Sequence, residues 1–206
     1  MSTHLKASII EKNLISIVDT VLSKSRVHTL TTEQVTTCHI TPTGHLVVSD
    51  IEKYLRVYSI QEDLNISEKG NLFLPKKVTH SWIDGSRLFF CDKYGDINSV
   101  DVDEIRELKE GEDAQIQLET GNFCTMTAAR LQQNSRGERF LITADEYYKV
   151  RVFDYPNIHS LKTSIAFRLR FVTSLQLYKD NLLLGFDDQE AYMVKQGQIE
   201  SSNSTE

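Results

Sequence analysis

The chain has 206 residues, enough for one domain with a well-filled core or for two small ones. Hydrophobic residues make up 40% and charged residues 25%, which are values of a globular protein and exclude a largely disordered one. A protein that binds nucleic acid without a partner usually has an excess of basic residues, which neutralise the phosphates. With a net charge of −6, this chain has no such excess.

The cysteines and the apolar runs limit the chemistry further. Cys38, Cys91 and Cys124 are odd in number, far apart and without a CxxC pair, so neither a zinc knuckle nor a disulfide framework is indicated. No positively charged start followed by an apolar run opens the chain, and no long apolar segment follows. We therefore expect a soluble protein of the nucleus or the cytoplasm, with no membrane contact.

A repeated pattern dominates the chain: an apolar run, an Asp, a short polar turn and a second, alternating run. A faint first copy at 7–20 has Glu11 in place of the Asp. The clear copies are HLVVSDIEKYLRVYSI (45–60), RLFFCDKYGDINSVDV (87–102), RFLITADEYYKVRVFDY (139–155) and NLLLGFDDQEAYMVKQG (181–197). Their aspartates, Asp50, Asp92, Asp145 and Asp187, are spaced by 42, 53 and 42 residues.

Each copy predicts a β-hairpin, because Asp starts a turn by bonding its own backbone and alternating apolar residues fit a half-buried pleat. A further strand is expected before each hairpin, at 35–44, 78–86, 126–138 and 172–180. The segment 102–113 is the best helical candidate and is interpreted as a charged loop or one short helix.

Four short strands per unit of about 40 residues is the plan of a propeller blade. The sequence therefore predicts an all-β, WD-repeat-like β-propeller that is degenerate and either complete or incomplete, with four full blade-like units and a partial first one. A β-sandwich and a closed barrel are the alternatives. The propeller domain is expected over 1–197, followed by a disordered polar tail at 198–206.

Two stretches resemble a known family. The turn Asp92-Lys93-Tyr94-Gly95-Asp96 and the segment 145–157, which ends in Tyr-Pro-Asn, are similar to the WD-repeat, non-catalytic subunit of the eukaryotic tRNA (guanine-N7-)-methyltransferase. The resemblance is good over 74–172 and weaker over 45–60. Neither stretch is generic to WD repeats.

The resemblance implies a subunit without catalytic residues or a cofactor of its own. It would form a nuclear heterodimer with a Rossmann-type catalytic subunit, which binds S-adenosylmethionine and methylates a guanine in the tRNA variable loop. The propeller would stabilise the active shape of that subunit and meet tRNA mainly through the complex. Basic residues in the segment DEYYKVRV (145–152) would contact the catalytic subunit, which implicates Lys149 and Arg151.

The chain departs from the family in two ways. The family propeller has seven blades, whereas this chain offers four units and a partial one. The Gly-His usually found before the Phe-Val strand is replaced by Arg168-Leu169-Arg170. The chain is therefore a reduced form, a fragment, or a propeller with unusually short blades.

Lys149 and Arg151 are two residues apart, so on a strand their side chains share a face and suit carboxylates of a partner. The alternative is a solvated outer strand, and the pattern alone favours it. Arg56, six residues past Asp50, repeats the place of Arg151, so the fold itself tolerates Arg there. Lys149 has no such counterpart, because Tyr54 takes its place.

Other basic residues are candidates of lower rank, and each has a solvated surface as its alternative. Lys93 is a candidate for contact with the partner. The densest basic spots are predicted to lie near RNA through Lys76, Lys77, Arg168 and Arg170. Asp92 and Asp96 are interpreted as turn residues and not as a metal pair.

Three functions remain open from the sequence. The first is the accessory subunit for tRNA N7-guanine methylation. The second is a generic WD-repeat scaffold of another complex. The third is an inactive propeller fragment. No GxSxG, HExxH, Walker loop or GxGxxG is present, so an enzyme is not indicated.

Overall fold

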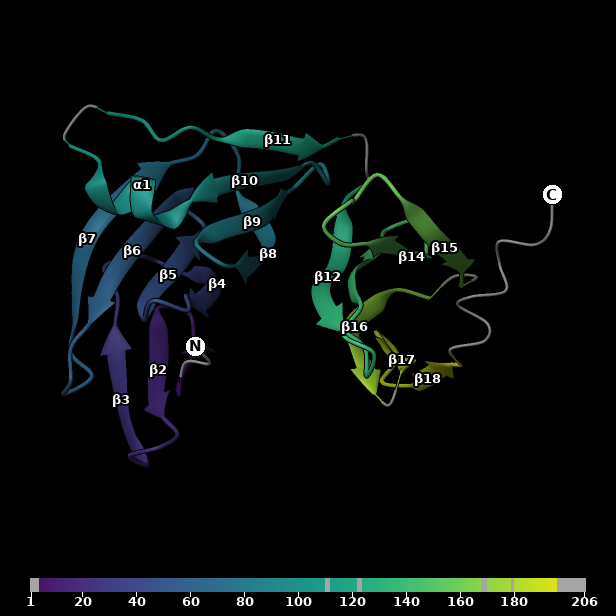
Figure 1. Cartoon of the computed structure of the whole chain (residues 1–206), viewed down its shortest axis with the longest axis horizontal. Coiled ribbons are helices and arrows are strands. Elements are labelled where there is room, and N and C mark those ends of the chain that lie inside the picture. Colours follow the sequence, from purple (N-terminus) through teal and green to yellow (C-terminus); the bar gives the residue numbers. More distant parts are fainter. Residues whose placement is uncertain (1–3, 110–111, 122–123, 168–169, 179, 196–206) are drawn as a thin grey trace. The chain divides into compact units, whose positions relative to one another are not determined.

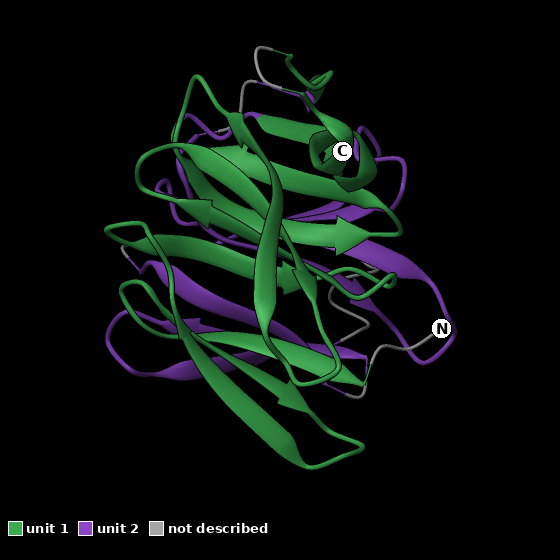
Figure 2. Ribbon diagram, turned by 90° about the vertical axis from the view of Figure 1, so that its left-hand side faces the viewer, with its two compact units in different colours: residues 1–93, 97–118 green, residues 94–96, 119–206 purple. Residues whose placement is uncertain are grey.

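The computed structural model describes residues 4–109, 112–121, 124–167, 170–178 and 180–195. The tail predicted at 198–206 lies outside these residues. Cα packing divides the chain into two compact units, residues 1–93 with 97–118 and residues 94–96 with 119–206 (Figure 2). The single domain expected over 1–197 stays a prediction.

The described residues form five antiparallel sheets, each built from strands that follow one another in the chain (Figure 1). The first unit holds the sheets β1–β2–β3, β4–β5–β6–β7 and β8–β9–β10–β11, with β11 running into the second unit. The second unit holds β12–β13–β14–β15 and β16–β17–β18. The all-β prediction is confirmed.

The bounds of the elements are as follows. In the first and second sheets they are β1 (Leu5–Glu11), β2 (Leu14–Asp19), β3 (Lys24–Thr29), β4 (Val35–Ile40), β5 (His45–Asp50), β6 (Tyr54–Ile60) and β7 (Ile66–Phe73). In the third they are β8 (Val78–Asp84), β9 (Arg87–Asp92), β10 (Ile97–Asp101) and β11 (Gln117–Thr120), with α1 (Val102–Glu107) between the last two. In the fourth and fifth they are β12 (Met126–Gln133), β13 (Arg139–Asp145), β14 (Lys149–Asp154), β15 (Leu161–Ala166), β16 (Val172–Tyr178), β17 (Asn181–Phe186) and β18 (Ala191–Val194).

The predicted hairpins are the second and third strands of their sheets. The copies at 45–60, 87–102, 139–155 and 181–197 form β5–β6, β9–β10, β13–β14 and β17–β18, and the strands expected before them are β4, β8, β12 and β16. Three sheets have the four strands of a blade. Among the described residues the last sheet, expected to be full, has three strands, as does the first.

The first copy was placed one strand too early. Residues 7–20 form the first and second strands of their sheet, not the second and third, because β2 pairs with β1 on one side and with β3 on the other. The residue that ends the second strand is therefore Asp19, which is buried, whereas Glu11 is exposed. The interpretation of Glu11 as the counterpart of the aspartates is wrong, and Asp19 takes that place.

The core of the first unit lies between its sheets and explains the continuous apolar runs. Along β5, Leu46 and Val48 join a cluster with Ile15 and Ile17 of β2, whereas Val47 joins a cluster with residues of the third sheet. A strand buried on both faces needs apolar residues in succession and not in alternation. In the second unit one cluster joins the fourth and fifth sheets.

The helix predicted as one alternative for 102–113 is α1, which packs against β7 (Figure 1). Asp101 caps its N-terminus by accepting a hydrogen bond from the backbone N–H of Asp103 at 2.8 Å. A Cβ on Gly70 of β7 would lie 2.1 Å from the carbonyl oxygen of Ile105, so only glycine lets the helix approach this closely.

Candidate docking surface

A buried aspartate ends the second strand in four of the five described sheets, and in three of them its carboxylate accepts backbone N–H groups of the turn that follows. The exposed fractions of Asp19, Asp50, Asp92 and Asp145 are 4%, 1%, 3% and 2%. Each carboxylate lies beside a basic side chain of the same unit, namely His4, Arg56, Lys76 and Arg151 respectively. Asp187, in the fifth sheet, is exposed and departs from this arrangement.

The Asp50 turn is closed by contacts within its own sheet. One carboxylate oxygen of Asp50 accepts the backbone N–H of Tyr54 at 2.9 Å, and the other accepts Nε–H of Arg56 at 3.2 Å. Burial opposes the charge of Arg56, but the hydrogen bond to Asp50 and the nearby Glu68 raise its pKa above the ordinary value. The ring of Tyr54 lies 4.8 Å from the guanidinium of Arg56 and 5.3 Å from the ring of Phe73. The turn is satisfied internally.

The Asp145 turn uses the same backbone frame. Oδ1 of Asp145 accepts the backbone N–H groups of Tyr147 at 2.9 Å and of Lys149 at 3.1 Å. The guanidinium of Arg151 donates to Oδ2 of the same carboxylate. Tyr148 has a φ of 62°, and its ring centroid lies 4.8 Å from that of Phe171. One carboxylate therefore holds the backbone of the whole turn.

Lys149 and Arg151 share a strand face, but their surroundings differ. Val150 and Val152, which alternate with them, point into the core of the second unit. The side chain of Arg151 is 19% exposed and is paired with Asp145. Lys149 is exposed, and no ion pair of its side chain is found among the described residues. Contact of either residue with a partner stays a prediction, and the geometry favours Lys149.

The structure adds one residue that the sequence reasoning did not single out. Tyr147, beside Lys149 in the Asp145 turn, is 63% exposed. The sequence could have indicated Tyr147 because it is an aromatic residue in a predicted turn, where Gly, Asn and Asp are the usual residues. A large exposed ring on a fixed backbone is a typical anchor of a protein interface.

The basic candidates of the first unit fall into two kinds. Lys76 forms an ion pair of 2.7 Å with the buried Asp92, so it neutralises a turn of its own chain. Lys77 and Lys93 are exposed. Their proximity to RNA or to a partner stays a prediction.

In the second unit, Arg170 is compensated by its own chain. Its guanidinium lies 3.0 Å from a carboxylate oxygen of Asp188 and 2.7 Å from one of Glu190, and it covers the ring of Phe186 at 4.1 Å. The hydrogen bond that its guanidinium donates to Asp188 raises the pKa of Arg170. Arg168 lies outside the described residues. The RNA-facing role of both stays a prediction.

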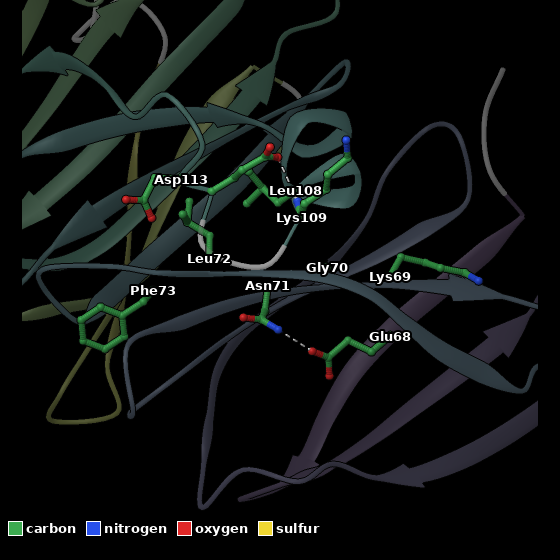
Figure 3. A pocket seen from close by; sticks show the side chains of 10 residues that line it. Glu68, Lys69, Gly70, Asn71, Leu72, Phe73, Leu108, Lys109 and Asp113 are labelled. Carbon is green, nitrogen blue, oxygen red and sulfur yellow. Dashed lines mark hydrogen bonds between the residues drawn. The ribbon is translucent and has the colours of Figure 1, made fainter.

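A hollow lies in the first unit, between the edge strand β7 and the segment after α1. Its volume is about 790 Å³, and Figure 3 shows Glu68–Phe73 on one side and Leu108, Lys109 and Asp113 on the other. Glu68 accepts a hydrogen bond from Asn71 at 3.0 Å, and Glu112 accepts one from the backbone N–H of Lys109 at 3.0 Å. Two of the carboxylates that line the hollow, those of Glu68 and Glu112, are thus held by neighbours.

A chain of hydroxyl groups links two sheets of the first unit. Ser81 of β8 lies 2.8 Å from Nε2 of His39 and donates to Thr37 at 2.6 Å, both on β4, and Thr37 lies 2.6 Å from the hydroxyl of Ser49. Burial lowers the pKa of His39 to about 4, so its imidazole is neutral at pH 7.

The residues with a described placement contain no group of three or more His, Cys, Asp or Glu side chains arranged to hold a metal ion. No helix in this part of the chain is long and apolar enough to cross a membrane.

Comparison with known proteins gives relatives but no family model. The tRNA (guanine-N(7)-)-methyltransferase non-catalytic subunit TRM82 of Saccharomyces cerevisiae is 30% identical over 154 residues, which cover 70% of this chain and 33% of TRM82. TRM82 of Lodderomyces elongisporus is 22% identical over 138 residues, 67% of this chain and 35% of its own. The resemblance expected from the sequence is confirmed, and the chain spans about a third of the length of these relatives.

Solved structures show the same fold at low identity. The β-propeller domain of Myceliophteria thermophila Cps50 (Swd1) matches with a TM-score of 0.62 at 12% identity, over 93% of this chain and 62% of that one. The designed Ika8 protein matches with 0.57 at 14%, over 93% and 57%. A chain of the mitotic checkpoint complex matches with 0.59 at 15%, over 84% and 51%. The propeller-type fold is thereby confirmed.

Proposed function

We propose that this relative of the TRM82 subunits is itself a non-catalytic subunit of a tRNA (guanine-N7-)-methyltransferase. It binds and stabilises the catalytic subunit as a heterodimer, meets tRNA mainly through the complex, and acts in the nucleus without membrane contact. The observation that carries the proposal is the 30% identity to TRM82 over 154 residues.

The mechanism is a shift in the conformational population of the partner. Docking of Lys149 onto an acidic group that is in place only in the active form of the catalytic subunit favours that form. The net charge of −6 agrees with this division of labour, because a subunit that docks a tRNA-binding partner need not carry the phosphate contacts.

The test is co-expression with the catalytic subunit of the same organism, followed by tRNA methylation with and without this chain. We expect co-purification and higher methylation with the chain present. Lys149→Glu should abolish both without loss of the fold. Lys6→Glu, the same charge reversal on an exposed strand lysine of the first sheet, is the matched control and should change neither.

Reversal of both cations is a poorer test. A glutamate at position 151 would face the buried carboxylate of Asp145, so Arg151→Glu disturbs the turn as well as any contact. A generic scaffold in another complex is the second candidate, and it takes the place of the first if wild-type chain neither co-purifies with the catalytic subunit nor raises methylation.

A further inference from the structure

We propose that the outer edge of β7 binds an extended, basic segment of a partner protein, which adds to the second sheet as a further strand. The stretch 70–73 would pair with the segment, and the carboxylates of Glu112 and Asp113 would meet its lysine or arginine side chains. This contact lies in the first unit and is separate from the docking of the catalytic subunit through Lys149.

The outer edge of β7 presents backbone donors and acceptors. β7 is an outermost strand of its sheet, and just after it Leu74 donates its N–H inward to the carbonyl of Lys53 at 2.8 Å. Hydrogen bonds of an antiparallel pair alternate along the strand, so the backbone N–H and C=O groups of Asn71 and Phe73 point away from β6. Such a row of groups is a template for another strand.

The hollow described above gives an added strand its room. Its volume of about 790 Å³ lies along 68–73 of β7, with Leu108, Lys109 and Asp113 on the far side (Figure 3). A bulge at Lys69 separates 70–73 from the earlier part of β7. The regular stretch that faces the hollow is therefore 70–73, which suits a short extended segment and not a long one.

The two sides of the stretch 70–73 differ in chemistry, because successive side chains of a strand point to opposite faces. On one side Leu72 is buried in the core, with Leu108 packed against the same cluster and Glu112 and Asp113 lining the hollow. On the other side Phe73 is 53% exposed. An added strand would thus direct alternate side chains toward the carboxylates and the others toward the ring of Phe73.

The carboxylates select a basic occupant. Glu112 and Asp113 are exposed, and among the described residues neither forms an ion pair, although Glu112 accepts the backbone N–H of Lys109. A second hollow shares both residues and is lined also by Glu104 and Glu107. Acidic side chains on this scale repel phosphate groups, so the groove suits a basic peptide and not RNA.

Two lysines, Lys69 and Lys109, also line the larger hollow. Figure 3 shows that their ammonium groups lie away from the end of the hollow at which Asp113 and Phe73 are found. At that end the negative charge is not cancelled by either lysine, so a cationic side chain of the added strand finds a carboxylate there.

The experiment titrates the full chain with synthetic peptides and follows its backbone amide NMR signals. The basic probe is Lys-Val-Lys-Val-Lys-Val, which places lysines on one face of a strand and valines on the other. We expect shifts at 70–73 and 112–113, with an affinity that falls as salt is added. The acidic probe Glu-Val-Glu-Val-Glu-Val and the basic probe with methylated backbone nitrogens should each bind about tenfold more weakly or not at all.

Variants of the chain test the two contacts separately. Asn71→Pro removes an outward N–H without loss of a ladder bond and should abolish binding, whereas Asn71→Ala should retain it. Asp113→Lys should weaken binding of the basic probe by about fivefold or more at low salt. Glu33→Lys, the same reversal at an exposed glutamate between β3 and β4, is the matched control and should bind like wild type.

Several outcomes would overturn the inference. Absence of binding to the wild type, or shifts confined to residues outside the groove, would show that the edge of β7 takes no basic strand. Equal binding of the methylated probe would show attraction by charge without strand pairing, and equal binding of the acidic probe would remove the charge argument. Self-association of the wild-type chain that Asn71→Pro abolishes would assign the edge to a second copy. None of these results bears on co-purification with the catalytic subunit, so the proposed function is tested independently.

Discussion

In the Asp50 turn the side chain four residues after the aspartate is Tyr54, whereas in the Asp145 turn it is Lys149. Tyr54 packs on Arg56 and Phe73 of its own sheet, and Lys149 is exposed. Lys53 and Tyr148, just before these positions, both have a positive φ, of 73° and 62°. The two turns thus have a similar backbone conformation but expose different side chains. Binding of a partner therefore depends on the side chains of a particular turn and not on the repeat itself.

The largest expected effect tests what the turns share. Asp50→Ala and Asp145→Ala each leave a mostly buried guanidinium without its carboxylate and remove the acceptor of turn amides, so each should lower the free energy of unfolding by about 3 kcal/mol. Urea denaturation measures this. The docking proposal expects loss of partner binding for Asp145→Ala alone, and equal loss for Asp50→Ala would break the comparison.

Mild acid should weaken the unit that holds the Asp50 turn. His39 has its pKa lowered to about 4, against 6.5 when unfolded, so the unfolded chain binds the proton first as the pH falls. This contribution to stability is present above pH 6.5 and is lost progressively between pH 6.5 and 4, and the loss at pH 5 amounts to about 2 kcal/mol. His39→Gln should reduce this slope in urea denaturation at pH 5 to 7. An unchanged slope would show that His39 is not its source.

A smaller effect is expected when Tyr54 of the Asp50 turn is replaced by lysine, the residue at the equivalent position 149 of the Asp145 turn. Tyr54→Lys removes the edge contact with Phe73 and the ring under Arg56, which should lower the free energy of unfolding by about 1 kcal/mol. Thermal unfolding measures the change. No loss would mean that the internal contacts of Tyr54 contribute little, and that exposure alone separates the two turns.

The reverse exchange should have the smallest effect on stability. Lys149→Tyr replaces an exposed side chain, so the free energy of unfolding should change by less than about 0.5 kcal/mol. Affinity for the catalytic subunit should fall, because the ammonium group is lost. Stability that falls by several times this amount would show that Lys149 supports the fold, contrary to its exposure.

The sequence predicted the strands well because the signals were local. Apolar runs followed by Asp located β5, β9, β13 and β17, and the short helix was one of two alternatives for 102–113. The prediction for the first copy failed because Glu11, like the aspartates, stands between two apolar runs but ends the first strand of its sheet. In the structure the acidic residue of the repeat ends the second strand. Asp19 was the better match, since it follows the apolar run of β2 as Asp50 follows that of β5.

The candidate site was predicted less completely, because its side-chain contacts depend on the three-dimensional structure and leave no local pattern in the sequence. That Arg151 pairs with Asp145 depends on side-chain directions across a turn, although Arg56 in the same place was a signal for it. That Lys76 reaches Asp92 depends on how the segment before β8 runs beside the end of β9. Exposure of Tyr147 could be suspected from an aromatic residue in a turn, but only the packing of Tyr148 on Phe171 shows which of the two rings is left outside.

The double burial of β5 also bears on how the first unit comes apart. Because Leu46 and Val48 belong to one cluster while Val47 belongs to the other, the second sheet cannot unfold without exposing both clusters. Unfolding of the second sheet therefore removes the packing of both the first and the third sheet. The three sheets of the first unit should melt in a single cooperative transition, and a partly unfolded form that keeps only the first or only the third sheet should not accumulate.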